Sequence, residues 1–172
     1  MAVGNLEFIK SASGTSVSSL SVTDCFSANY DVYKITVRQD TAAANGVKTQ
    51  LIDSGGSVVI SSNYDYALYS MRSGTSFSDA DRTTSTDSMR LLYQGTNDSG
   101  ATMYIYNPFS SSSFTFGQSQ QSLYYGGAGI QLMGIKAISV LKLTTSCTGI
   151  KFTPISPNFT DINVSVYGLA SK

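Results

Sequence analysis

The aromatic side chains are the groups of this sequence best suited to contact a ligand or another protein. The chain has 11 Tyr and 8 Phe but no Trp, and tyrosine combines a large apolar ring with a hydrophilic hydroxyl. We predict the following residues as interface or ligand contacts: Tyr64, Tyr66, Tyr69, Phe77, Tyr104, Tyr106, Tyr124 and Tyr125. Core packing and cross-strand pairing are the main alternative, and the lack of Trp weakens the case for sugar stacking.

Groups that could perform catalysis are few. Histidine is absent, so Ser–His–Asp and Cys–His catalysis cannot be built from this chain. A pair of carboxylates can hydrolyse a glycosidic bond, but Glu7 is the only glutamate, and Asp65, Asp98 and Asp161 neighbour residues typical of turns. The sequence therefore predicts a protein that is not an enzyme, with no catalytic residue and no cofactor.

Metal-ligating residues are also sparse. Asp79, Asp81 and Asp87 share one Ser/Thr-rich stretch, and calcium takes six to eight oxygen ligands. The spacing does not fit an EF-hand, and Arg82 inside the stretch would repel a cation. Only two cysteines are present, too few for a zinc site of Cys/His type. We predict no metal, and free buried thiols at both cysteines.

The elements that position these residues are predicted to be strands throughout. Apolar and polar residues alternate along Tyr33–Arg38, Thr102–Asn107 and Ile162–Leu169, the period of a strand with one buried face. About ten short strands separated by Gly, Asn, Asp and Ser predict an all-β fold, a jelly-roll-like antiparallel β-sandwich. Residues 1–172 are predicted to form a single domain. Further strands are predicted at Val17–Phe26, Val47–Asp53, Val58–Ser61, Tyr64–Met71, Met89–Gln94, Phe114–Phe116, Leu123–Tyr125 and Gly149–Thr153.

The remaining segments are predicted from composition. Ser73–Ser88 is rich in Ser, Thr and Asp and predicts a long exposed loop, and Gly117–Ser122 predicts a polar connection. Ile130–Thr144 is the longest apolar stretch, typical of a strand buried on both faces or of a bent strand broken at Gly134. The segment 1–14 predicts a first strand or an arm onto a neighbour, and 126–129 predicts a turn.

The charge balance restricts the partners. Eleven basic and eleven acidic residues give a formal net charge of zero, and only 13% of residues are charged. Such a surface protects poorly against association and suits a subunit of an assembly. Nucleic-acid binding needs clustered Lys and Arg, and a membrane span needs about 18 consecutive apolar residues. We predict neither nucleic acid nor membrane as a partner, and we find no signal peptide in the sequence.

Four segments resemble a family of small jelly-roll virion proteins of tailed bacteriophages, especially phages of marine bacteria. Such proteins typically have an aromatic strand of the form Tyr-Asp-Val-Tyr-Lys and a last strand that ends in Tyr-Gly-Leu, which match Tyr30–Lys34 and Tyr167–Leu169 here. The resemblance covers nearly the whole chain and is carried by Val22–Val37, Tyr104–Phe109, Thr148–Phe152 and Asn158–Leu169.

The resemblance implies a setting rather than a chemistry. It implies a virion structural protein at the particle surface, synthesised in the host cytoplasm, either as a capsid decoration protein or as a tail-fibre or receptor-binding module. The partners implied are major capsid or tail proteins, with a host surface glycan or protein for the second alternative. A homo-oligomer is expected, with a trimer suited to a capsid threefold axis.

Overall fold

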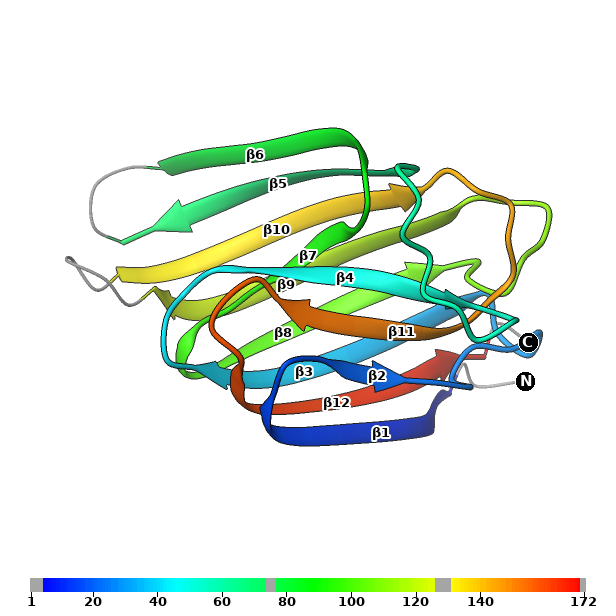
Figure 1. Ribbon diagram of the computed structural model, residues 1–172, viewed down its shortest axis with the longest axis horizontal. Coiled ribbons are helices and arrows are strands. Elements are labelled where there is room, and N and C mark those ends of the chain that lie inside the picture. Colours follow the sequence, from blue (N-terminus) through cyan, green and yellow to red (C-terminus); the bar gives the residue numbers. More distant parts are fainter. Residues whose placement is uncertain (1–4, 74–76, 126–130, 171–172) are drawn as a thin grey trace.

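Strands make up all the regular structure in the described part of the chain (Figure 1). The computed structural model describes residues 5–73, 77–125 and 131–170, leaving out the side chains of 77–80 and 131. The predicted turn at 126–129 and the first four residues lie outside that part. The strands are β1 (Leu6–Val17), β2 (Leu20–Val22), β3 (Val32–Thr41), β4 (Gly46–Asp53), β5 (Tyr64–Arg72), β6 (Phe77–Thr86), β7 (Met89–Tyr93), β8 (Thr96–Tyr106), β9 (Thr115–Tyr125), β10 (Gln131–Leu141), β11 (Cys147–Pro154) and β12 (Phe159–Leu169).

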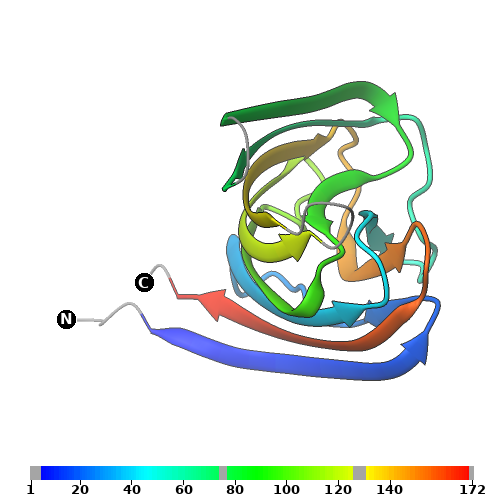
Figure 2. The same ribbon diagram turned by 90° about the vertical axis from the view of Figure 1, so that its left-hand side faces the viewer.

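The strands form two antiparallel sheets that pack as a β-sandwich, which confirms the predicted fold class. The larger sheet has the order β1-β12-β3-β8-β9-β10-β5-β6, and the smaller one has the order β2-β11-β4-β7. Figure 2 shows the larger sheet bending around the smaller one, with β5 and β6 at one end and β12 and β1 at the other. No helix in the described residues is long and apolar enough to cross a membrane.

The connectivity is that of a jelly roll with two inserted hairpins. Without β5–β6 and β9–β10, every connection passes from one sheet to the other except the one from β4 to β7, which are neighbours in the smaller sheet. The sheet orders then reduce to β1-β12-β3-β8 and β2-β11-β4-β7. This is the eight-stranded, two-sheet arrangement of the jelly roll. The inserted hairpins pair with each other through β5 and β10 and extend the first sheet beyond β8.

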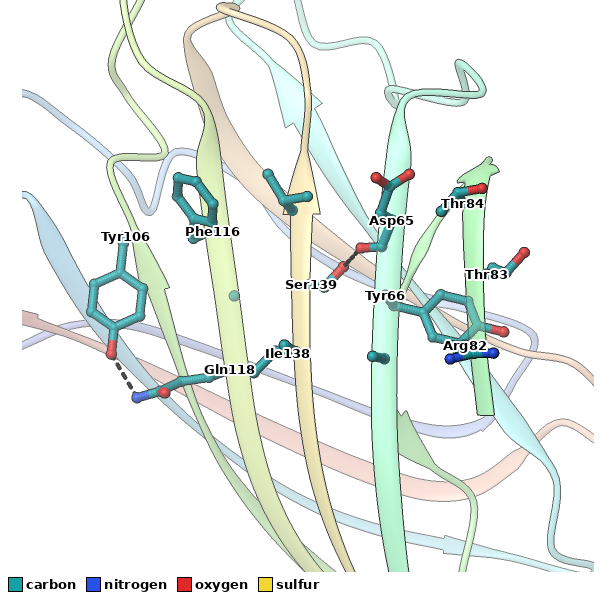
Figure 3. A pocket seen from close by; sticks show the side chains of 13 residues that line it. Asp65, Tyr66, Arg82, Thr83, Thr84, Tyr106, Phe116, Gln118, Ile138 and Ser139 are labelled. Atoms are coloured by element: carbon teal, nitrogen blue, oxygen red, sulfur yellow. Dashed lines mark hydrogen bonds between the residues drawn. The ribbon is translucent and has the colours of Figure 1, made fainter. Parts of the chain in front are cut away.

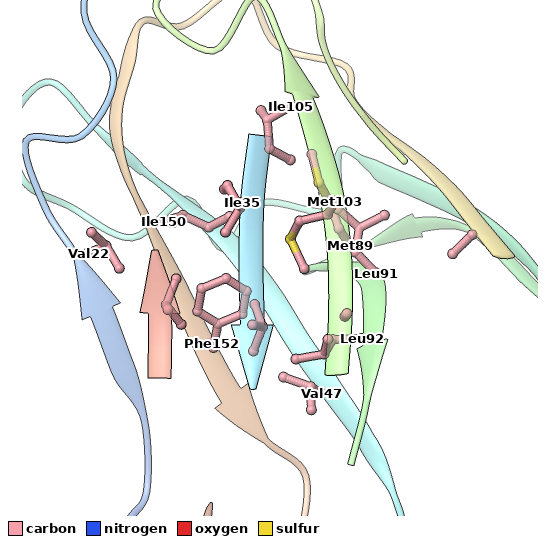
Figure 4. Packing of buried hydrophobic residues seen from close by; sticks show 14 of the residues in the cluster. Val22, Ile35, Val47, Met89, Leu91, Leu92, Met103, Ile105, Ile150 and Phe152 are labelled. Atoms are coloured by element: carbon pink, nitrogen blue, oxygen red, sulfur yellow. The ribbon is translucent and has the colours of Figure 1, made fainter. Parts of the chain in front are cut away.

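The core lies between the two sheets and is formed by alternate residues of the strands (Figure 4). On β3 and β12 the buried residues are those that the sequence pattern predicts, including Ile35 and Val164, both 0% exposed. The smaller sheet contributes Leu51, Ile150 and Phe152, all equally buried. Burial of such side chains contributes about 1.5–3 kcal/mol each, so this packing determines which face of each strand points inward.

The predicted loop at Ser73–Ser88 is wrong, because residues 77–86 form the strand β6. β6 pairs antiparallel with β5 and is the edge of the larger sheet. An edge strand is held by backbone hydrogen bonds on one side and tolerates polar and charged side chains, which also discourage pairing with other molecules. Because its side chains are mainly Ser, Thr and Asp, β6 lacks the apolar alternation by which a strand is predicted from sequence.

The predicted polar connection at Gly117–Ser122 is also wrong, because β9 runs without interruption through it. Small or polar residues face inward along β9: Gly117 and Ser119 are buried, whereas Gln118 and Gln120 are exposed. A Cβ at Gly117 would lie 2.7 Å from Leu91 Cδ1. The smaller sheet approaches β9 too closely there for a larger side chain, which explains the missing apolar signal.

The apolar stretch at Ile130–Thr144 contains the strand β10, which continues through Gly134 and is buried on one face only. Ile135 is 3% exposed and Ile138 is 58% exposed. The predictions of burial on both faces and of a break at Gly134 are therefore wrong. The smaller sheet covers only one side of β10, and none of the described strands covers the other.

The structure also tests four other predictions. The N-terminal segment is a strand, since β1 pairs with β12. The predicted strand Val17–Phe26 is divided between β1 and β2, and the one predicted at Val58–Ser61 is reduced to a single bridge between Val58 and Ile52. Cys25 and Cys147 are free and buried, as predicted, and burial raises the pKa of each thiol to about 12.

Candidate functional site

The outer face of the larger sheet, which points away from the smaller sheet, has two neighbouring rows of apolar side chains. Residues directly opposite each other on antiparallel strands have Cβ atoms about 4.5–5.5 Å apart, so the strand register shows which side chains are adjacent. The rows cross the strands near the first residues of β1 and the last residues of β12. We call them together the outer band: Leu6, Phe8, Val32, Ala67, Tyr104, Tyr106, Phe116, Ile138, Val140, Tyr167 and Leu169.

The first row of the outer band is apolar across six strands. Its register runs as successive cross-strand pairs from β10 to β1 without a polar residue: Val140, Phe116, Tyr106, Val32, Leu169 and Leu6. The second row begins at Ala67 and Ile138 and ends at Tyr167 and Phe8. It also includes the polar residues Gln118 and Lys34, on either side of Tyr104.

The outer band is exposed to solvent over much of its length. Phe8 is 61% exposed, Ile138 58%, Phe116 49% and Leu6 46%. Scattered apolar residues are normal on a protein surface, but a contiguous exposed patch marks an interaction site. The outer band is therefore the region of the described surface best suited to bind another molecule.

A groove of about 820 Å³ lies at the β5–β6 end of the outer band (Figure 3). Its apolar lining includes Tyr106, Phe116 and Ile138, and its polar lining includes Arg82 and Gln118. The Gln118 amide donates a hydrogen bond of 2.6 Å to the Tyr106 hydroxyl. An apolar surface with a few fixed polar groups is the usual composition of a ligand pocket.

The carboxylate of the groove, that of Asp65, is held in its ionised form. Asp65 accepts hydrogen bonds from Lys142 Nζ at 2.9 Å and from the Ser85 backbone N–H at 2.8 Å. These bonds, that of Lys142 first, hold the pKa of Asp65 below its usual range. The group stays ionised at neutral pH, whereas a general acid must hold a proton there.

Two of the predicted contact residues lie on the outer band, and two more are exposed on the same face outside it. Tyr104 and Tyr106 belong to the band. Tyr69 is 43% exposed opposite Lys136, and Tyr124 is 42% exposed opposite Leu132. Phe77 begins β6, where its backbone is opposite Met71, and its side chain lies outside the described set.

The other predicted contact residues point to the interior side of the sheet. Tyr64 is 0% exposed, and its hydroxyl accepts from the Leu51 N–H and donates to the Val59 carbonyl, both at 3.1 Å. The Tyr66 ring lies 5.3 Å from the Arg90 guanidinium, and the Tyr125 ring lies 5.3 Å from that of Arg72. Some of the predicted tyrosines therefore pack on the core side of the sheet, and others lie on its surface, where they can contact a partner.

The acidic residues considered for calcium binding have separate partners. Asp81 Oδ2 lies 3.3 Å from the Tyr66 hydroxyl and 3.7 Å from Arg90 Nη1. Asp87 bonds to Lys48 Nζ at 2.6 Å, and this bond lowers the pKa of Asp87. Across residues 5–73, 77–125 and 131–170, no group of three or more His, Cys, Asp or Glu is placed to hold a metal ion.

Most of the outer band lies outside the contact residues predicted from the sequence. Leu6, Phe8, Phe116, Ile138 and Leu169 were not among the predicted contacts, although they are among its most exposed members. A signal was present in β10, where Ile138 is out of phase with the buried Ile135. That signal becomes informative only when the strand is known to have one uncovered face.

Comparison with known proteins gives no match, either to models of known families or to curated protein sequences. The chemistry of the surface and the jelly-roll topology are therefore the basis for an assignment of function.

Proposed function

We propose that the protein is a non-enzymatic structural component of a bacteriophage particle, a capsid decoration protein that binds the shell through the outer band. The observation that carries this proposal is the contiguous exposed apolar surface on one sheet face of a chain with zero net charge. A surface of this kind is stabilised when a partner covers it.

The jelly-roll topology supports the proposal at the level of fold. Viral capsid proteins are one group among the many that use this architecture, and the fold alone does not specify a function. The resemblance of Val22–Val37 and Asn158–Leu169 to phage virion proteins is the reason for proposing a phage particle as the place where the protein acts. Those two segments include the first part of β3 and all of β12, the adjacent strands at the centre of the unextended sheet.

The mechanism is stabilisation by binding. A protein that binds the assembled shell and not its free subunits shifts the equilibrium toward the shell, by RT ln(1 + [L]/Kd) for each site. The surface it uses requires no charge pairing, because the exposed members of the outer band are apolar. We therefore expect binding to persist at high salt, unlike an interaction between charged surfaces.

The test is a binding titration of the purified protein on emptied phage capsids, with tail assemblies and host cells as comparison surfaces. We expect saturation at a fixed ratio to the major shell subunit. Ile138→Asp should weaken capsid binding at least about tenfold, because it places a charge in the apolar contact. Leu132→Asp is the matched control, since Leu132 is 56% exposed on the same strand and face but outside the outer band. Equal effects of the two substitutions, or binding to tails alone, would contradict the proposal.

The groove supports a second candidate function, that of a tail-fibre or receptor-binding module. Tyr106 and Phe116 offer ring faces, and Arg82 and Gln118 offer hydrogen-bond donors, a combination that suits a host glycan or surface protein. Saturable binding of the isolated protein to host cells, reduced by Phe116→Ala and absent on capsids, would favour this function over decoration.

A further inference from the structure

The sheet edges of this molecule are not equally protected against pairing with another strand. Each sheet ends in two edge strands, which expose unpaired backbone N–H and C=O groups and can extend the sheet with a strand of another chain. In the smaller sheet these edges are short: β2 has 3 residues and β7 has 5. In the larger sheet they are β6 and β1.

β6 is a poor template for a further strand. It carries Asp79, Asp81 and Arg82, and its register with β5 shifts at two places. Charged side chains and bulges on an edge strand are the usual features that prevent edge-to-edge association.

β1 has little of this protection. It is 12 residues long, and its last seven residues, Ser11–Val17, contain no charged residue and no proline. Its pairing with β12 shows one irregularity, between Phe8 and Lys10, after which the register is continuous as far as Thr15.

The two charged residues of β1 are bound within the chain. Glu7 accepts a hydrogen bond from the Tyr30 hydroxyl. Lys10 donates to the Thr23 carbonyl at 2.7 Å and lies 4.0 Å from Asp24. Both charged side chains therefore already have partners within their own chain.

We infer that β1 pairs antiparallel with β1 of a second copy of this chain, so that two eight-stranded sheets join into one across a twofold axis near Ala12. The register centred on Ala12 sets Ser11 opposite Ser13 of the second copy, both on the outer face. It sets Lys10 opposite Gly14, so that no like charges face each other. Antiparallel pairing then satisfies the edge groups of both copies. This interface does not depend on the virion role, because it uses the backbone of β1 and leaves the centre of the outer band free.

The test is the mass of the purified chain in solution, by sedimentation velocity from about 1 to 100 µM, without capsids. We expect a dimer whose fraction rises with concentration. The double variant Ser11→Lys/Ser13→Lys should weaken the dimer at least about tenfold, because the introduced lysines face each other across the axis. The variant Gln120→Lys/Ser122→Lys is the matched control, with the same charges on exposed positions of β9, and should dimerise as the unchanged chain does.

A mixing experiment distinguishes pairing from damage to the fold. A second variant, Ser11→Glu/Ser13→Glu, should be as weak alone as the lysine variant, and an equimolar mixture of the two should form a heterodimer. Hydrogen exchange of the unchanged chain supplies an independent measurement, with β1 backbone amides protected at 100 µM and less protected at 1 µM. A monomer up to 100 µM, a trimer, no heterodimer in the mixture, or β1 exchange that is independent of concentration would each overturn the inference.

Discussion

Ile135 and Ile138 lie on the same strand, β10, and have opposite surroundings. Ile135 is 3% exposed and is part of the core between the two sheets, whereas Ile138 is 58% exposed in the outer band. The two faces also differ along β9, where the small residues Gly117 and Ser119 face inward while Phe116 faces solvent. In the part of the sheet that extends beyond β8, apolar residues on the inner face stabilise the fold. Apolar residues on the outer face form a surface that a partner can bind.

The largest expected contrast is between two phenylalanines. Phe152 lies on β11 and is 0% exposed. Phe152→Ala should lower the free energy of unfolding by about 3–5 kcal/mol, because a cavity remains in the core. Phe116→Ala should change stability by less than about 0.5 kcal/mol while weakening partner binding. Urea unfolding of both variants measures this, and a Phe116→Ala loss close to that of Phe152→Ala would mean that the outer band is part of the fold's own packing.

The isoleucines of β10 give a smaller contrast within one strand. Ile135→Ala should cost about 2–5 kcal/mol, and Ile138→Ala less than about 0.5 kcal/mol. The two substitutions remove the same atoms, so the difference in urea midpoint reports burial alone. Equal midpoints would show that the two faces of β10 are equally covered.

Two tyrosines of β5 extend the comparison to hydrogen bonding. Tyr64→Phe removes a buried hydroxyl that bonds to the Leu51 N–H and the Val59 carbonyl, and should cost about 1–3 kcal/mol, because these groups are left without that partner. Tyr69→Phe alters an exposed ring and should be neutral within about 0.5 kcal/mol. Thermal unfolding would compare them, and a neutral Tyr64→Phe would show that the buried hydroxyl contributes nothing net.

The smallest effect is expected from a surface ion pair. The hydrogen bond from Lys48 holds the pKa of Asp87 below its ordinary value. A carboxyl whose pKa is lower in the folded state contributes stability above the unfolded pKa, about 3.9, and loses it as the pH falls through the folded pKa. Both side chains are 42% exposed, so the pair should contribute less than about 1 kcal/mol.

Thermal unfolding between pH 7 and pH 2.5 measures this contribution. The unchanged chain and Asp87→Asn should differ most at pH 7, and their unfolding temperatures should converge as the pH falls below about 4. A difference that grows toward low pH would contradict the assigned sign.

The sequence predicted the fold class and several strand faces because alternation is a local property. Along Tyr33–Val37 of β3 and Ile162–Val166 of β12, every second residue is large and apolar, and those residues are the buried ones. The same reasoning failed for β6 and for the middle of β9. In β6 an edge position permits polar side chains, and in β9 close approach of the smaller sheet requires small ones, so neither strand has an apolar period.

The candidate site was predicted only in part for a related reason. Tyr104 and Tyr106 were singled out for their residue type and do lie on the outer band, while Tyr64 was singled out in the same way and is buried. Residue type indicates that a side chain can bind a partner, but its exposure depends on the sheet that covers it.

The sequence alone determined that no histidine is available for catalysis, that the net charge is zero, and that strands dominate the chain. The tertiary structure decided that Leu6, Val32, Tyr106, Phe116 and Leu169 are neighbours in one row. These residues are distant in the chain, and only the pairing register of several strands sets them side by side. Because that register arises from burial of the opposite face, the surface is a consequence of the core and cannot be seen in any single segment.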